Sequence, residues 1–369
     1  MKLPKLSALN PARCWDAGMS PEVLIAAKLA WLLLVCGGFF ARVGRPGAAM
    51  VSLFDGFPAG AGWLMPVLFA VSGLALLTNQ AARTAAVVAG ACALLTPLFS
   101  IAAWRSHEWI CGAILLLAGL DKPGGTSLLV RAQATLCLGV VLFDQTGAVD
   151  WTTQATLEGW RVDRDSWSLL QSMRESLPAG MLGFAGSWLV PLSALVIATG
   201  LWIQSMRRIA VWCACAWLLV GYLVIGTDTA ALFTLATLVA MLAFLDWPRS
   251  SIAAHWPRAC GWPMWLRIAL DHHDYDRRTE WPFPQNPDAD LDVWIDGAHL
   301  TGRRGIAALL LYFPLFHMTV FSAVILLLLV LPQPWAMVAH VAIGVWLLAF
   351  FAPAAFGRPR TTTTESTER

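Results

Sequence analysis

The stretch VLIAAKLAWLLLVCGGFFARV, residues 23–43, decides the fold that the sequence predicts. About 20 mainly apolar residues match a bilayer core of roughly 30 Å, because each helical residue rises about 1.5 Å. A secretory signal has a shorter apolar core of roughly 7 to 15 residues, and no small-residue cleavage site follows this run. We therefore expect a membrane helix that stays in the chain.

The composition agrees with that expectation. The 369 residues are 58% hydrophobic and 13% charged, with a mean hydropathy of +0.63, whereas soluble domains average about 25% charged residues. A net charge of +2 excludes nucleic acid as a partner, since a basic surface is missing. The eight cysteines lack a C-x-x-C pair and lie mostly in apolar runs, so neither a disulfide framework nor a metal site is predicted.

The predicted fold class is all-α: a polytopic transmembrane helical bundle of about ten spans with a small cytoplasmic α+β insertion. Short cytoplasmic loops are enriched in Lys and Arg, and this rule places both termini in the cytoplasm. The expected location is a bacterial cytoplasmic (inner) membrane, with multiple passes. The apolar runs that define the spans are 23–43, 62–79, 85–104, 107–121, 127–146, 180–202, 207–226, 228–246, 305–331 and 335–356.

This reading divides the chain into consecutive regions. An outer amphipathic segment is expected at 147–179, and LDVWIDGAHL (291–300) predicts a hairpin with Asp296 and Gly297 in its turn, because a two-residue turn of that kind needs positive φ. The regions are a cytoplasmic N-terminus 1–22, a transmembrane bundle 23–248, a cytoplasmic loop or subdomain 249–304, a transmembrane pair 305–356 and a disordered tail 357–369.

Ionisable residues within apolar runs are candidates for function, because burying them in an apolar environment is costly. His317 and His340 fall inside the last two predicted spans, and Asp144 lies near the outer end of the fifth. We take Asp144 to be the only carboxylate within a span, which argues against an ion-coupled transporter. The acidic and histidine cluster 271–276 is interpreted as a solvated turn instead of a metal site.

The fifth span begins with Arg131 and Gln133, and Trp151 follows its end; FLDWP closes the region at 244–248. In these features residues 23–248 resemble the HTTM group, membrane proteins related to vitamin K-dependent gamma-carboxylase. The resemblance implies a catalytic lysine where this chain has Gln145 and Thr146. An amide or hydroxyl cannot take up a proton near neutral pH, so carboxylase activity is not expected. Relatives joined to a thiol–disulfide oxidoreductase domain imply a possible partner of that class.

The sequence leaves three functions open, and it identifies no cofactor, catalytic residue or metal. The first is an HTTM-like membrane protein that contacts the lipid bilayer, binds a lipid, quinone or peptide, and assists a partner. The second is a membrane-embedded modifying enzyme that uses His317, His340 or Asp144. The third is a structural or immunity-type membrane component. The candidate polar residues within the spans are Arg131, Gln133, Asp144, Gln145, His317 and His340.

Overall fold

The computed structural model describes the chain in segments. They are residues 19–44, 62–99, 105–121, 128–147, 176, 181–225, 228–244, 251–256, 264–274, 279–282, 291–295, 297–313, 316 and 318–323.

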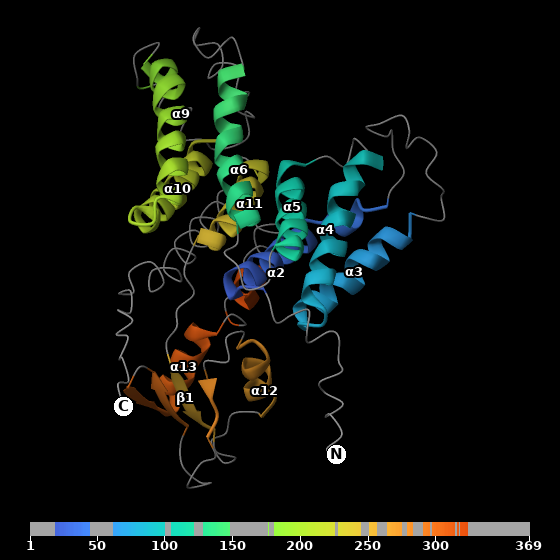
Figure 1. Cartoon of the computed structure of the whole chain (residues 1–369), viewed down its shortest axis with the longest axis vertical. Helices are drawn as coiled ribbons and strands as arrows, with labels where there is room; N and C mark the ends of the chain where they lie inside the picture. The colour runs from blue at the N-terminus through green and yellow to red at the C-terminus, as the bar shows by residue number, and fades with distance from the viewer. Residues whose placement is uncertain are drawn as a thin grey trace, which may run out of the picture.

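The larger part of the described chain is an assembly of helices, which occupies the upper half of Figure 1. Within it α4 lies along α5, α3 packs on α4, and α2 contacts α5; α6, α9, α10 and α11 form a neighbouring group. The elements are α2 (Pro21–Cys36), η2 (Phe39–Ala41), α3 (Leu64–Leu77), α4 (Ala82–Phe99), α5 (Ser106–Leu120), α6 (Leu128–Gly147), α9 (Met181–Trp202), α10 (Arg207–Ile225), α11 (Asp228–Met241) and η7 (Leu242–Phe244).

Small residues let these helices approach closely. A Cβ added to Gly73 of α3 would fall 1.8 Å from the ring of Trp31 in α2, and the indole N–H of Trp31 donates to the carbonyl of Phe69 over 3.3 Å. A Cβ on Gly90 of α4 would fall 2.4 Å from the backbone nitrogen of Leu116 in α5. Glycine at both positions therefore permits contacts that a larger side chain would block.

The smaller part is a four-stranded mixed sheet with two helices, in the lower half of Figure 1. The strand order is β2-β1-β3-β4; β1 pairs parallel with β2 and antiparallel with β3, and β3 pairs antiparallel with β4. The elements are β1 (Ile252–His255), α12 (Met264–His272), β2 (Thr279–Glu280), β3 (Asp292–Ile295), β4 (Ala298–Thr301) and α13 (Gly302–Tyr312).

Alternation along the strands gives this sheet one buried face. Ile252, Ala254, Val293 and Ile295 are buried and join a core with Leu270 of α12 and residues of α13. Ile295 is paired with Ala298, so the connection has two residues, and Gly297 has a φ of +87°. The hairpin predicted from Asp-Gly is therefore confirmed.

The prediction of a ten-span transmembrane bundle is wrong. Among the described residues, no helix combines the length and the apolar character needed to cross a membrane, and the chain also contains the mixed sheet. The helices α2, α3, α5 and α11 have 14 to 16 residues, which rise about 21 to 24 Å, short of the roughly 30 Å required. The same finding overturns the multi-pass inner-membrane location and the description of these helices as transmembrane.

Several predicted regions cannot be compared. The outer amphipathic segment 147–179 lies outside the described residues except at 147 and 176, and the tail 357–369 lies wholly outside them. Of the predicted pair 305–356, the described residues are 305–313, 316 and 318–323, and residues 302–312 form α13.

Candidate functional site

A buried polar centre lies where the end of α2 meets the beginning of α5. After Cys36 the chain turns through Gly38, whose φ of +77° is the left-handed region that glycine tolerates, and a short 3-10 helix then leads to Arg42. On the other side, Arg105 is extended and α5 begins at Ser106. The first turn of α5 therefore carries His107 and Glu108 to the place that Arg42 reaches from α2.

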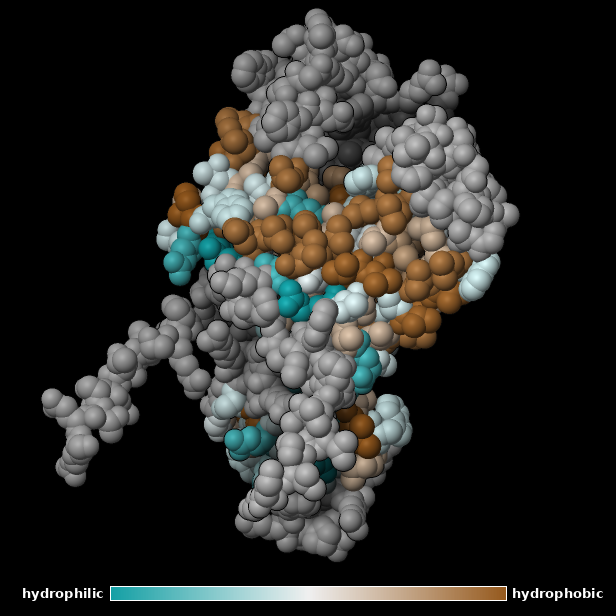
Figure 2. Space-filling view, turned by 45° about the vertical axis from the view of Figure 1, so that its right-hand side comes forward, coloured by the Kyte–Doolittle hydropathy of each residue, from teal (hydrophilic) through white to brown (hydrophobic). Residues whose placement is uncertain are grey.

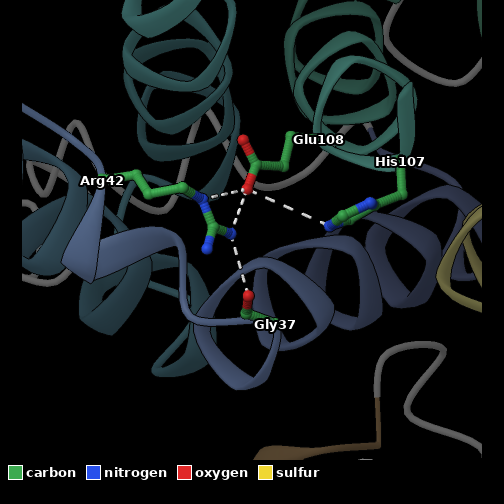
Figure 3. Close-up of polar contacts among 4 residues, drawn as sticks. All are labelled: Gly37, Arg42, His107 and Glu108. Carbon is green, nitrogen blue, oxygen red and sulfur yellow. Dashed lines mark hydrogen bonds and ion pairs between the residues drawn. The ribbon is translucent and has the colours of Figure 1, made fainter. Parts of the chain in front are cut away.

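Arg42 and Glu108 form the ion pair of the centre (Figure 3). The Arg42 Nε–H donates to Oε1 of Glu108 over 2.9 Å, and its Nη2 donates to the same oxygen and to the carbonyl of Gly37, the latter over 2.9 Å. His107 lies beside them, with Nε2 at 4.0 Å from Glu108 Oε1. One carboxylate oxygen thus takes both contacts from the guanidinium.

Three polar atoms of His107 and Glu108 are buried without hydrogen-bond partners. The side chains of His107 and Glu108 are 1% and 0% exposed, and that of Arg42 is 18% exposed. Neither ring nitrogen of His107, nor Oε2 of Glu108, has a hydrogen-bond partner among the described residues. Buried polar atoms are nearly always hydrogen-bonded, so an orphaned cluster of three is a marker of function.

Burial and charge set the protonation of the two titratable groups. Burial, with Coulomb repulsion from Arg42 and Arg105, lowers the pKa of His107 to about 4. Burial raises the pKa of Glu108, while the hydrogen bond and charge of Arg42 oppose that rise. At neutral pH His107 is therefore a neutral ring with one N–H donor and one acceptor nitrogen.

A second buried charge lies midway along α2, where it contacts the end of α3. Lys28 of α2 is fully buried, and its ammonium donates to the carbonyl of Leu77 over 3.2 Å and to Oδ1 of Asn79. Asn79, in the turn after α3, donates in turn to the backbone carbonyl of His272 in α12 over 3.0 Å. This turn therefore connects the helical part to the sheet part, and its polar groups are used for attachment.

Two predicted site residues hold helices together. Arg131 of α6 donates from Nε to the carbonyl of Ala243 over 2.6 Å and lies over the ring of Phe244 at 5.6 Å. Gln133 donates from Nε2 to the carbonyl of Ile110 in α5 over 2.8 Å. Both are buried, and these contacts join α6 to η7 and to the first turns of α5.

The other predicted site residues are not tested. Asp144 and Gln145 belong to the backbone of α6, but their side chains lie outside the described part, as do His317 and His340 entirely. Their proposed roles remain predictions. In the cluster 271–276, Asp271 accepts from the indole of Trp281 and Asp274 from the backbone N–H of Thr279; within the described residues no group of three or more metal-binding side chains occurs.

Helix α3 has a buried face that contacts the segment before Arg42 and an exposed apolar face on its other side. Phe39 and Phe40, just before Arg42, pack on Phe69 of α3 with ring centroids 4.8 and 5.2 Å apart. The outer face of α3 exposes apolar residues at helical spacing, namely Leu64, Val67, Leu68, Val71 and Leu74 at 41 to 60%. We call these five residues of α3 the α3 stripe. Figure 2 shows that other hydrophobic residues extend in a broad band across the helical part.

Sequence reasoning missed the centre because its residues are distant in the chain. Arg42 and Glu108 are separated by 66 positions, and Glu108 stands at the polar edge of the fourth apolar run. Asp144 is not the only carboxylate in an apolar run, because Glu108 lies in the first turn of α5. The usable signal was the pair His107 and Glu108 directly before Trp109, a polar pair attached to an apolar helix.

No family model matches the chain, and no curated protein or solved structure matches it either.

Proposed function

We propose that the helical part of this chain binds lipid, with acyl chains lying against its exposed apolar side chains. The observation that supports this most strongly is the α3 stripe, five apolar residues at positions i, i+3, i+4, i+7 and i+10 that are 41 to 60% exposed. A stripe at this spacing normally faces a protein core. Its outward position calls for an apolar partner.

The distribution of exposed residues favours lipid over a protein partner. Protein interfaces are compact patches with an apolar centre and polar rim, whereas here exposed aliphatic side chains occur on several helices that point in different directions. Trp63, which precedes the first residue of α3, is 63% exposed, which suits an indole at the boundary between acyl chains and water. The further exposed residues are Leu128, Leu129, Leu136, Leu192, Leu195, Val196, Ile209 and Val220.

The proposal retains the binding function expected from the HTTM resemblance and excludes carboxylation. In this chain Arg131 and Gln133 contribute backbone contacts between helices, which accounts for their presence without a reaction. Assistance to a thiol–disulfide oxidoreductase stays a prediction of the resemblance.

Vesicle binding tests the proposal. Purified protein is mixed with phosphatidylcholine vesicles and the bound fraction is measured by flotation. The variant V67S/V71S/L74S removes apolar area from the α3 stripe, and we expect binding to weaken about tenfold or more, since burying such a side chain is worth about 1.5 to 3 kcal/mol. The matched control V67I/V71I/L74M keeps the apolar area and should bind like the wild type. Absence of wild-type binding, or equal binding by both triple variants, contradicts the proposal.

A further inference from the structure

We propose that the centre formed by Arg42, Glu108 and His107 binds an uncharged hydroxyl group at the polar end of a lipid. The inference rests on the proposed function for the apolar part of the ligand, and it adds the chemistry of the head. It selects an alcohol, such as the free hydroxyl of a diacylglycerol, over a phosphate, a carboxylate or a ketone.

Hydrogen-bond accounting leads to this choice. Oε2 of Glu108 and one ring nitrogen of neutral His107 need donors, and the other ring nitrogen is an N–H that needs an acceptor. A hydroxyl has one donor hydrogen and an acceptor oxygen, so a single group can donate to Oε2 of Glu108 and accept from the N–H of His107. A ketone or ester carbonyl only accepts, and would also leave Oε2 of Glu108 buried without a donor, a loss of about 1 to 3 kcal/mol.

Charge accounting excludes an anionic head. The guanidinium of Arg42 already contacts Glu108 and the carbonyl of Gly37, so its charge is offset within the protein. A phosphate would add uncompensated negative charge beside Glu108, which is fully buried. Such a charge is strongly disfavoured without a partner of its own.

The centre meets the surface beside an exposed aromatic side chain, Phe40, against which the apolar part of a ligand would lie. Arg42 is the one member of the three with an appreciably exposed side chain, at 18%, so the centre meets the surface there. The residues just before it, Phe39 and Phe40, pack on Phe69 of α3, and Phe40 is 39% exposed. Phe69 belongs to the buried face of α3, opposite the stripe, so the exposed apolar side chain beside the centre is that of Phe40.

The test compares lipids that share acyl chains and differ in the head. Wild-type protein is titrated with diacylglycerol, with the same molecule acetylated at its hydroxyl, and with phosphatidic acid, each in detergent micelles. We expect diacylglycerol to bind about tenfold more tightly than either competitor, the size of one or two hydrogen bonds. Equal affinity for diacylglycerol and its acetylated form overturns this inference while leaving lipid binding intact; binding of none of the three overturns both proposals.

Two variants separate a binding role from a merely structural one. E108Q keeps the shape of the side chain and its acceptor for Arg42 but frees the arginine charge, so we expect the preference to move toward phosphatidic acid. H107F keeps a ring of similar volume but removes the N–H donor, so it should weaken binding of the free and the acetylated lipid alike, while the preference for the free hydroxyl, which depends on Oε2 of Glu108, is retained. Unchanged head preference in E108Q, or unchanged affinity for both lipids in H107F, contradicts the inference, and thermal unfolding of each variant confirms that the comparison is made on folded protein.

Discussion

The two parts of this molecule distribute polar and apolar groups in opposite ways. The sheet part buries Val293, Ile295 and Phe313 and presents His299 and Asp292 outward. The helical part buries Lys28, His107 and Glu108, each at most 1% exposed, while the α3 stripe is turned outward. Among the described residues of the sheet part, large exposed apolar side chains occur only on α12.

This difference shows that the hydrophobic effect can give a protein a polar surface where it faces water and an apolar surface where it faces an apolar partner. In a sheet whose strands alternate apolar and polar residues, the helices of the same part cover the apolar face, and the polar face is solvated by water. A helix that is apolar all round has no such division, so its outer side chains require an apolar partner. In the helical part, buried polar residues then form hydrogen bonds between helices or bind a ligand.

The largest effect is expected from a core truncation in the sheet part. Phe313 is 2% exposed, so F313A should lower the free energy of unfolding by about 3 to 5 kcal/mol. The matched change W265A removes an aromatic side chain that is 66% exposed and should cost within about 0.5 kcal/mol. Urea unfolding followed by hydrogen exchange in β3 measures both. Similar losses in the two variants would contradict the assignment of the core.

A double-mutant cycle sharpens the contrast between the buried ion pair and an exposed hydrogen-bonded pair. Removing Arg42 leaves Glu108 buried without its counter-charge, so R42A should cost about 3 kcal/mol, and more than E108A, which leaves a partly exposed arginine. The coupling energy between the two should be about 1 to 3 kcal/mol.

The control cycle uses Asp292 and His299 in the sheet part, 3.1 Å apart with side chains 30% and 48% exposed. Its coupling should stay below about 1 kcal/mol. Equal coupling in the two cycles would remove the distinction between the regions.

Acid should destabilise the protein through His107, with a smaller effect. Its pKa is lowered to about 4 in the folded chain, below the usual value near 6.5 for an unfolded one. Between these values the unfolded state binds the proton and the folded state does not, so stability falls as the pH falls, by up to about 1.4 kcal/mol per pH unit.

Replacing this ring removes that contribution. H107F should therefore flatten the stability curve between pH 6.5 and 4, measured by urea midpoints. A second histidine, the partly buried His273 in the sheet part, also has its pKa lowered to about 4, mainly by burial, and H273N should flatten the curve similarly. An unaltered slope in H107F would show that this histidine is already charged in the folded protein.

Helix positions and the hairpin could be predicted from the sequence because both depend on local patterns. The apolar run 207–226 corresponds to Arg207–Ile225, and the turn predicted from Asp-Gly falls between Ile295 and Ala298, the paired ends of β3 and β4. The assignment of those runs as transmembrane spans was wrong. Hydropathy measures how apolar a run is, but it does not give the length of the helix. That length depends on the residue at which the helix ends, which is Gly37 for α2 and Thr78 for α3.

The polar centre could not be predicted because long-range packing creates it. Nothing local to Arg42 indicates that Glu108 will meet it, and nothing local to Arg131 indicates that it will bond to Ala243, 112 positions away. Ranking ionisable residues by depth within an apolar run favoured His317 and His340. It passed over Lys28, which is deep in the first run and fully buried.

Hydrogen exchange with and without phosphatidylcholine vesicles tests the central claim most directly. The account predicts slower exchange along Leu64–Leu77 when vesicles are present, because acyl chains cover the α3 stripe, and unchanged exchange in β3 and β4, whose residues already pack within the protein. Identical exchange along α3 in the two conditions, or equal slowing in α3 and the sheet, would contradict it.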